Sequence, residues 1–228
     1  PARIRRWVTP APSGMGACID ACMAATYYDR SDVARGEFAS GSGRRVSRVS
    51  STRERIVQAA IALLGTEGAR ALTHRRVDQA AGLSEGSTSN HFRTRAALLE
   101  GAVEAITAAE MSEVRDAMRP QGPAELVEAL AGLVELVTGP ERVTTTARHV
   151  LFLEAAHDGQ LRARLAAARE GYVVVTREAL GALGAAEPAV AAEALMALCE
   201  GLILHRIARH DASDPRPAIA VAVRGALG

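Results

Sequence analysis

The stretch from Thr73 to Phe92 carries the clearest structural signal in the sequence. Its residues are THRRVDQAAGLSEGSTSNHF. Two alanines precede Gly82, and glycine is the residue that most readily takes the left-handed conformation of a tight turn. Leu83 follows and supplies an apolar side chain to fill the gap between two helices. The pattern predicts two short helices around a tight turn, a helix-turn-helix.

The second helix of this pair has almost no side chain that could fill a core. Between Glu85 and His91 it carries small hydroxyl residues, an amide and an imidazole, which are good hydrogen-bond donors and acceptors. A helix that displays such groups can enter a major groove and meet phosphates and base edges. Phe92 then returns the chain to the core.

Roles on DNA follow from side-chain chemistry. Thr73 and Ser84 are expected to cap helices, whose N-terminal amides can face phosphate. Ser87, Thr88 and Asn90 are expected to read bases, and Asn90 alone suits a bidentate contact with adenine. The full set of predicted DNA-binding residues is Thr73, Arg75, Ser84, Glu85, Gly86, Ser87, Thr88, Ser89, Asn90, His91, Arg93 and Arg95.

The charged members of this set have different expected roles. Arg75, Arg93 and Arg95 are expected to contact phosphates and set the register, and Gly86 lets the backbone approach the DNA. Glu85 would either accept from a cytosine amino group or, the interpretation we favour, stabilise the helix N-terminus.

Helical patterns extend on both sides of this stretch. Ser51-Thr52-Arg53-Glu54 forms a capping box that begins a helix ending between Gly65 and Gly68, and Thr94 caps a long helix that runs to about Met118. Glycine and proline then delimit five more helices, with Gly171 a candidate kink in the third of them: 123–138, 140–157, 159–183, 188–209 and 215–227. No strand alternation occurs, so we expect an all-α protein.

Charge divides the chain into a basic head and an acidic body. Between Arg44 and Arg95 ten Arg face four acidic residues, whereas from Ala96 onward 12 Arg face 18 acidic residues. This arrangement indicates a polyanion-binding head on a soluble body, although chance clustering on solvated faces would give the same numbers. We therefore expect a flexible extension at 1–45, a DNA-binding domain at 46–96 and a helical body at 97–228, which the family resemblance described below implies is a ligand-binding and dimerisation domain.

The sequence also limits the compartment. We find no apolar run long enough to span a bilayer and no secretory signal at the start, and three cysteines give no disulfide framework. These features predict a cytoplasmic protein without a membrane partner. Cys18 and Cys22 resemble half of a metal site, but without a nearby second pair we predict no metal site.

The stretch from Arg53 to Leu99 resembles the DNA-binding domain of the TetR family of bacterial regulators. The residues that carry the resemblance are Thr73, Arg75, the turn Ala80-Ala81-Gly82-Leu83-Ser84, Gly86-Ser87, His91-Phe92, Arg95 and Leu98-Leu99. The sequence departs from the family at Thr88-Ser89, where a Leu-Tyr pair is usual. That tyrosine commonly contacts phosphate, so the operator preference cannot be carried over.

The resemblance implies a homodimer that pairs through its last two long helices and binds a near-palindromic operator with half-sites about one turn, roughly 34–36 Å, apart. The interface candidates, which could equally be intramolecular core, are Val190, Leu195, Leu198, Leu202, Ile203, Ile219 and Val223. The resemblance also implies a small-molecule effector among the middle helices. Polar or aromatic residues on otherwise apolar helices are the pocket candidates, each of which could instead be structural: His149, Phe152, Glu154, Tyr172, Thr176 and His205.

The function we expect is that of a transcriptional repressor released from double-stranded operator DNA by a small molecule. An enzyme is disfavoured because the sequence lacks a nucleophile elbow, a P-loop, a dinucleotide fingerprint and an HExxH motif, and we expect no cofactor. A non-specific architectural DNA-binding protein is the alternative, but the recognition segment is polar rather than basic. The sequence does not separate a repressor from an activator.

Overall fold

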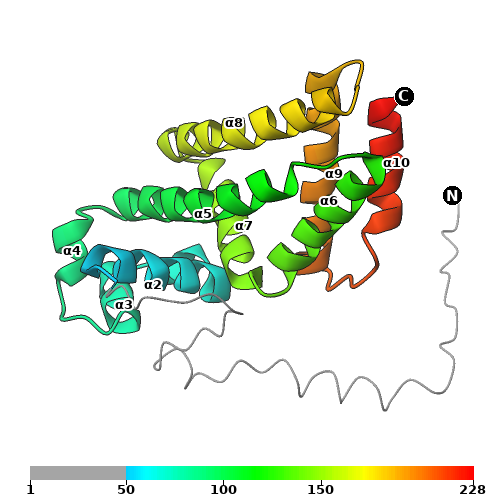
Figure 1. The fold of residues 1–228 in the computed structure, drawn as a ribbon. Coiled ribbons are helices and arrows are strands. Elements are labelled where there is room, and N and C mark those ends of the chain that lie inside the picture. Colours follow the sequence, from blue (N-terminus) through cyan, green and yellow to red (C-terminus); the bar gives the residue numbers. More distant parts are fainter. Residues whose placement is uncertain (1–49) are drawn as a thin grey trace, which may run out of the picture. The chain divides into compact units, whose positions relative to one another are not determined.

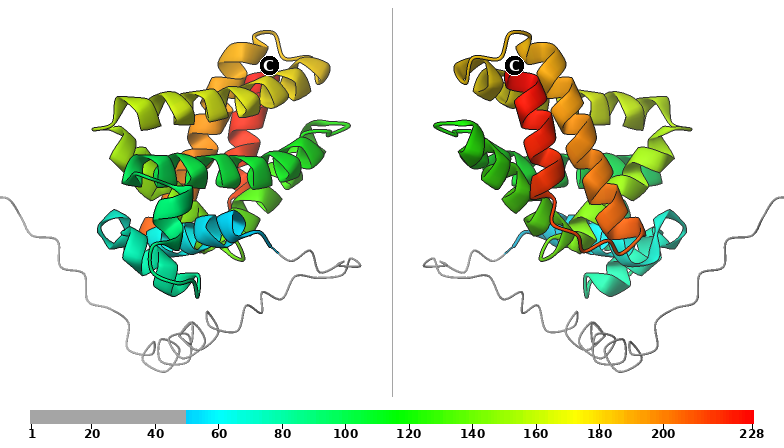
Figure 2. Two further views of the ribbon diagram at one scale, coloured as in Figure 1. Left: turned by 90° about the vertical axis from the view of Figure 1, so that its left-hand side faces the viewer. Right: turned by 90° about the vertical axis from the view of Figure 1, so that its right-hand side faces the viewer.

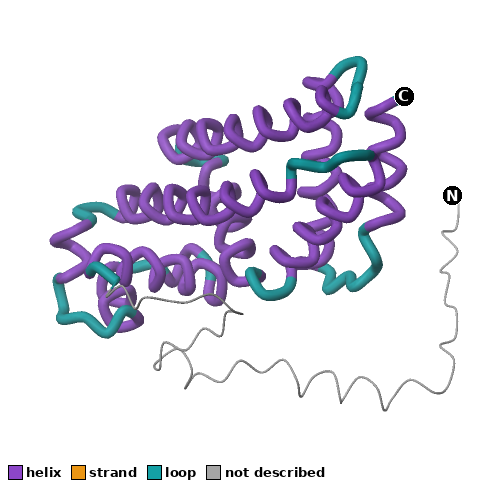
Figure 3. Tube along the Cα trace, viewed as in Figure 1, coloured by secondary structure: helices purple, strands orange, loops and turns teal. Residues whose placement is uncertain are grey.

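The computed structural model describes residues 50–228, and every regular element in that range is a helix (Figures 1 and 3). The expected extension at 1–45, with Cys18 and Cys22, lies outside the described residues. The elements follow in the order α2 (Thr52–Glu67), a 3-10 turn (Ala69–Ala71), α3 (His74–Ala80), α4 (Ser87–His91), α5 (Arg95–Ala117), α6 (Pro123–Thr138), α7 (Arg142–Ala155), α8 (Gly159–Ala182), α9 (Pro188–Ala208) and α10 (Arg216–Leu227).

Local sequence signals explain most of these boundaries. Ser51 forms the predicted capping box with Glu54, Thr73 caps α3 through the amide of Arg76, and Thr94 caps α5 through the amide of Ala97. Helix α8 continues without interruption through Gly171, the candidate kink site. The all-helical prediction is confirmed for the described residues.

Two apolar cores hold the helices together. The first is built from α2 to α5 and extends into α7 and the start of α8, with fully buried residues such as Ile56, Leu98 and Leu151. The second joins the end of α5 with α6, α9, α10 and the end of α8. The helix-turn-helix therefore shares its core with the body instead of hanging from a linker.

The contact between α2 and α7 is especially close at Gly65. A Cβ atom added there would overlap the backbone carbonyl of Val143 at the start of α7. Only a glycine lets the two helix backbones approach to this distance, so the head is seated directly on α7.

Helices α9 and α10 lie side by side at the end of the body remote from α3 and α4 (Figures 1 and 2). Four of the predicted interface residues face inward in the second core, because α10 packs against both α6 and α9: Leu195, Ile203, Ile219 and Val223. Those four are intramolecular core, so the prediction that they meet a partner is wrong. Leu198 and Leu202 are half-buried, and Val190 is 62% exposed.

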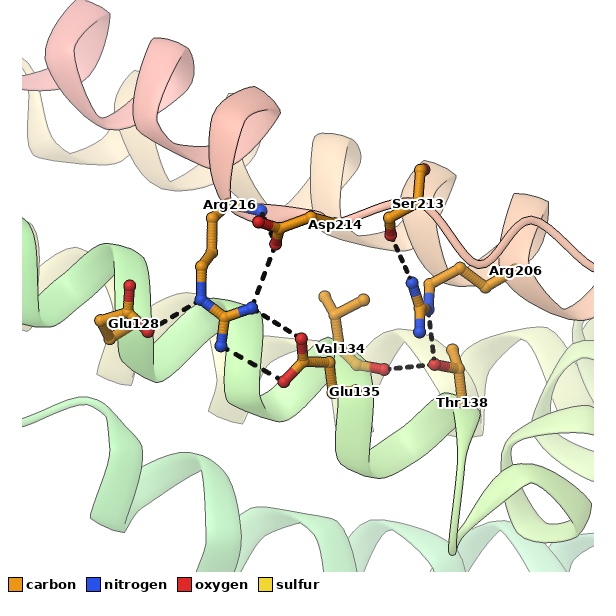
Figure 4. A network of polar contacts seen from close by, with 8 residues as sticks. All are labelled: Glu128, Val134, Glu135, Thr138, Arg206, Ser213, Asp214 and Arg216. Carbon is orange, nitrogen blue, oxygen red and sulfur yellow. Dashed lines mark hydrogen bonds and ion pairs between the residues drawn. The ribbon is translucent and has the colours of Figure 1, made fainter.

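Charged contacts fasten α10 and the loop before it to α6 (Figure 4). The Arg216 guanidinium donates to Glu128 at 2.9 Å, to Glu135 at 2.7 Å and to Asp214 at 3.0 Å. Arg206, near the end of α9, donates to Thr138 at 2.8 Å and to the Ser213 carbonyl at 2.7 Å. These bonds fix the position of α10 relative to α6 and α9.

Candidate nucleic-acid interface and ligand cavity

Helix α3 holds both ends of the recognition helix α4. The Asp78 carboxylate accepts from the backbone amides of Gly86 at 2.8 Å and Thr88 at 2.7 Å, at the start of α4. One turn earlier on α3, His74 Nε2 lies 2.7 Å from the Phe92 carbonyl, just beyond the end of α4. A carbonyl only accepts, so His74 donates this bond from Nε2. Two side chains at i and i+4 on α3 thus fix the position and direction of α4.

The turn before α4 differs from the prediction in one respect. Gly82 and Gly86 have positive φ values of 62° and 92°, and Gly86, not Ser84, is the N-cap residue of α4. The Ser84 side chain lies 3.0 Å from the hydroxyl of Ser87 and caps no amide of α4. The expectation that Ser84 caps this helix is wrong because a carboxylate from the preceding helix already occupies that place. The same carboxylate satisfies the amides of Gly86 and Thr88, so these amides are not free to bind phosphate.

Thr88 also differs from its predicted role. Its side chain is fully buried, and its hydroxyl donates to Asp78 Oδ1 at 2.5 Å. Thr88 is therefore a core residue bonded to Asp78, and the prediction that it reads bases is wrong. All other members of the predicted DNA-binding set are exposed or partly exposed, so the outer face of α4 presents Ser87, Ser89, Asn90 and His91.

The buried Asp78 is ionised in this arrangement. Burial alone would raise the pKa of its carboxyl, but the hydrogen bonds from the Thr88 hydroxyl and amide and from the Gly86 amide hold that pKa below its usual value. The sequence signal for this role was the position of Asp78 next to the buried Val77, on the inner side of α3.

The predicted phosphate-contacting arginines occupy different environments. Arg75 and Arg93 are exposed, and no ion pair involves them within the described residues. Arg95 is also exposed, but it pairs with Glu154 on α7 at 2.9 Å and donates to the Ala69 carbonyl at 3.0 Å. Arg95 therefore joins the head to α7 in this state.

A cavity of about 580 Å³ lies among α5 to α9, where the two cores meet. Val103, Ile106, Leu151 and Ala155 line it and are also members of the first core. The side chains that support the DNA-binding head therefore also form part of the cavity wall.

The otherwise apolar wall carries one polar cluster. Glu110 Oε2 accepts from Arg148 at 2.9 Å and from the Tyr172 hydroxyl at 3.0 Å. Arg148 reaches Glu200 at 3.4 Å, and His149 Nε2 lies 3.0 Å from Glu200 Oε1 without the alignment of a good hydrogen bond. The cluster thus places two carboxylates around one guanidinium.

The environment of the cluster affects its ionisation. Burial and the neighbouring Glu110 charge raise the pKa of Tyr172 well above its usual value. Burial opposes ionisation of Glu200, yet His149 and Arg148 lower its pKa overall. Cys199, also on the wall, has its pKa raised by burial to about 11, so it is an unreactive thiol at neutral pH.

The cavity includes three of the six predicted pocket residues, Phe152, Tyr172 and Thr176. The remaining three are not among its lining residues: His149 lies 3.0 Å from Glu200, Glu154 pairs with Arg95, and His205 is exposed on α9. Glu110 and Arg148 were not among the predicted pocket residues. Glu110 falls at helical spacing from Val103 and Ile106, and that position on an apolar face was the available signal.

Comparison with known proteins agrees with this architecture. Residues 56–102 match the family of bacterial regulatory proteins of the tetR type, and residues 121–228 match the tetracyclin repressor-like C-terminal domain. Among curated proteins, no sequence matches this chain. Several solved structures are similar, and we describe three of them.

The transcriptional regulator SCO7518 of Streptomyces coelicolor A3(2) is 26% identical over 78% of this chain and 99% of its own, with a TM-score of 0.62. A structure from Rhodococcus sp. assigned to the TetR family is 23% identical over 78% of this chain and 100% of its own, with a TM-score of 0.66. The multidrug binding protein EbrR, complexed with ethidium, is 24% identical over 78% of this chain and 99% of its own, with a TM-score of 0.64.

Helices α3 and α4 form a helix-turn-helix in which Asp78 of α3 holds the start of α4. The two family matches together cover about two thirds of the sequence. The chain belongs to the TetR family of bacterial transcriptional regulators.

Proposed function

We propose that this protein is a cytoplasmic, homodimeric repressor that leaves a palindromic operator when a small molecule enters the cavity. The observation that carries the proposal is the shared wall between head and cavity. Val103, Ile106, Leu151 and Ala155 contact the cavity on one side and belong to the core of the head on the other. A ligand that moves these side chains would therefore move the support of α4.

The exposed face of α9 and α10 supports dimerisation. Val190, Leu204 and Val221 are 62%, 46% and 61% exposed, which is unusual for large apolar side chains on two adjacent helices. Gly201 and Gly225 have open space around an added Cβ, so neighbouring helices could approach closely there. By length and composition alone α9 could cross a membrane, but it packs against α6, α8 and α10. We propose that a second copy of the chain covers this face. The proposed interface therefore consists of these exposed residues and not of the predicted residues that lie in the core.

Repressor action then follows from two states of the dimer. One state holds the two recognition helices about one DNA turn apart, and the ligand-bound state favours another spacing. A coupling free energy of about 1–3 kcal/mol would change operator affinity roughly 5- to 150-fold.

The first test is selection of bound duplexes from random DNA at fixed, near-physiological salt. A palindrome with half-sites about one turn apart would support the dimeric repressor. Binding without a motif, which simply weakens as salt rises, would instead favour the architectural alternative.

The interface is tested with the double variant Leu204→Glu/Val221→Glu. Light scattering should show a monomer, and the operator affinity should fall sharply because one head contacts only a half-site. Leu153→Glu is the matched control, since Leu153 is a 74% exposed apolar residue on α7. A dimer that persists in the double variant would contradict the proposed face.

A further inference from the structure

The polar cluster on the cavity wall indicates the chemical class of the effector. We propose that the cavity takes an apolar organic cation that carries an N–H donor, and that Glu110 receives this donor. The inference rests on the proposed ligand-binding role of the cavity. Its starting point is the charge of the cluster, where Glu110 and Glu200 share the single guanidinium of Arg148.

Glu110 has unused accepting capacity. It is 8% exposed and lines the cavity, and while Oε2 accepts from Arg148 and Tyr172, the buried Oε1 has no partner. A buried carboxylate oxygen without a donor is costly, so a ligand N–H placed there removes an existing penalty. A cationic donor also balances the second carboxylate of the cluster.

Glu200 is less suited to receive the ligand. It is close to both Arg148 and His149, at 3.4 and 3.0 Å. These two groups lower the pKa of Glu200. The side chain of Glu200 is 42% exposed, so water can reach its carboxylate, whereas the Glu110 side chain is only 10% exposed and its free oxygen has no such access.

An anionic effector is disfavoured at the polar cluster because the guanidinium there is already paired with carboxylates, and the one wall arginine without an ion pair within the described residues, Arg162, is exposed. Arg148 donates to the two carboxylates, Arg169 forms a two-bond pair with Glu193 at 3.1 and 2.6 Å, and Arg162 donates to the Ala155 carbonyl. An anion that displaced Glu110 from Arg148 would leave this buried carboxylate with the Tyr172 hydroxyl as its remaining donor. The unpartnered Arg148 Nε is a single donor and does not change this balance.

The rest of the wall suits an apolar, aromatic body. Met118, Leu130, Leu133 and Val134 are among its lining residues, and Phe152, also on the wall, is 41% exposed. The Phe152 ring already has the Arg148 guanidinium 5.9 Å from its centroid, so its face accepts positive charge. An aromatic cation would pack its apolar body against the aliphatic side chains and place its positive charge near the Phe152 ring.

The test uses three fluorescent ligands with the same apolar body: 1-pyrenemethylamine, 1-pyrenemethanol and 1-pyrenecarboxylic acid. They are titrated into the full chain at about pH 8, where an ordinary imidazole is neutral and an ordinary alkylamine is charged. We expect the amine to bind at least about tenfold more tightly than the alcohol, as loss of a charge-assisted hydrogen bond predicts. The acid should bind most weakly.

Variants identify the receiving group. Glu110→Gln should weaken the amine by about tenfold while changing the alcohol by less than about twofold. The matched control is Glu113→Gln, an equal charge change one turn later on α5 at an exposed residue outside the wall. Tyr172→Phe removes a donor from Glu110 and should strengthen binding of the amine. This variant tests the role of Glu110 if circular dichroism shows that Glu110→Gln is unstable.

The outcomes separate the ligand class from the proposed function. Equal binding of the amine, alcohol and acid would overturn the cation preference while leaving a ligand-binding cavity. Equal weakening of the amine by Glu110→Gln and Glu113→Gln would overturn the role of Glu110. Failure of all three ligands to bind would overturn the cavity as a site for apolar ligands, and with it the proposed release mechanism.

Discussion

The Asp78 carboxylate accepts both the backbone amide and the hydroxyl of Thr88, at 2.7 and 2.5 Å. This pair joins α3 to α4 across the turn and orients the recognition helix. The bond is buried, and the carboxylate also takes the Gly86 amide, so the first turn of α4 is tied to one side chain. The geometry of the DNA-binding face therefore depends on a residue that does not face DNA.

Asp78→Asn should destabilise the protein. The amide keeps the size of the side chain but places an NH₂ group where donors converge, and it removes the charge that strengthens these bonds. Hydrogen bonds to charged groups contribute about 1.5–3 kcal/mol, and we expect a loss of the unfolding free energy in that range. Urea unfolding followed by circular dichroism measures it.

The control for this variant is Glu85→Gln, which removes the same charge from an exposed position in the adjacent turn. It should leave the unfolding free energy within about 0.5 kcal/mol of the wild type. Equal effects of the two substitutions would show that the charge of the head matters and the capping bonds do not.

The contribution of Asp78 should depend on pH. Its pKa is lower in the folded state than in the unfolded chain, so its stabilisation is fully present above the unfolded value of about 3.9 and is lost as the pH falls through the folded value. The stability difference between wild type and Asp78→Asn should therefore be constant from about pH 5 to 7 and narrow below about pH 4. A stability difference that stays the same from pH 7 down to below about pH 4 would mean that Asp78 is not ionised in the fold.

Substitutions of Thr88 and Asn90 should have different effects, the first on the stability of the protein and the second on its DNA sequence specificity. Thr88→Val removes a buried hydroxyl and should lower the unfolding free energy by roughly 1–3 kcal/mol without changing the selected DNA motif. Asn90→Ala should relax the motif at one base position by roughly 1–3 kcal/mol of discrimination while leaving stability nearly unchanged. A motif altered by Thr88→Val but not by Asn90→Ala would reverse these assignments.

Local signals determined what could be predicted from the sequence. Glycine, proline and capping residues delimit the helices, so their order and approximate bounds were predictable. The cap of α4 could not be predicted from local sequence, because the carboxylate that accepts its first amides belongs to Asp78 on the preceding helix, ten residues from Thr88. Thr88 stands where the family usually has leucine, and its burial against Asp78 explains how a polar residue occupies that core position.

The cavity and the dimer face were harder to predict for a related reason. Glu110 and Arg148 are 38 residues apart and meet only in the tertiary fold, and either one alone resembles a solvent-facing charge. On α9 the apolar pattern covers nearly the whole helix, so periodicity does not distinguish the side facing α10 from the exposed side. Burial in the structure makes that distinction.

Gly65→Ala should destabilise the contact between head and body. The added methyl group would overlap the Val143 carbonyl, and the two helices would have to separate. Overpacking of this kind costs about 1–3 kcal/mol. Gly132→Ala is the control: an added Cβ on that exposed residue of α6 has open space, so better helix propensity should stabilise the protein by roughly 0.5–1 kcal/mol. A stabilising effect at both positions would show that α2 and α7 adjust without strain.

Arg95 is expected to exchange partners between Glu154 and DNA phosphate. In the structure its guanidinium lies 2.9 Å from Glu154, which belongs to α7 beside the cavity-lining Ala155. Glu154→Gln should free the guanidinium and strengthen operator binding by up to about fivefold, whereas Arg95→Gln should lower the salt dependence of binding by about one phosphate contact. Glu67→Gln, which breaks the similar pair with Arg76, controls for the loss of one negative charge that pairs with an arginine of the head. Fluorescence anisotropy over a salt series measures both effects. An unchanged salt slope in Arg95→Gln would show that Arg95 only fastens the head to α7, and the exchange with phosphate would then be excluded.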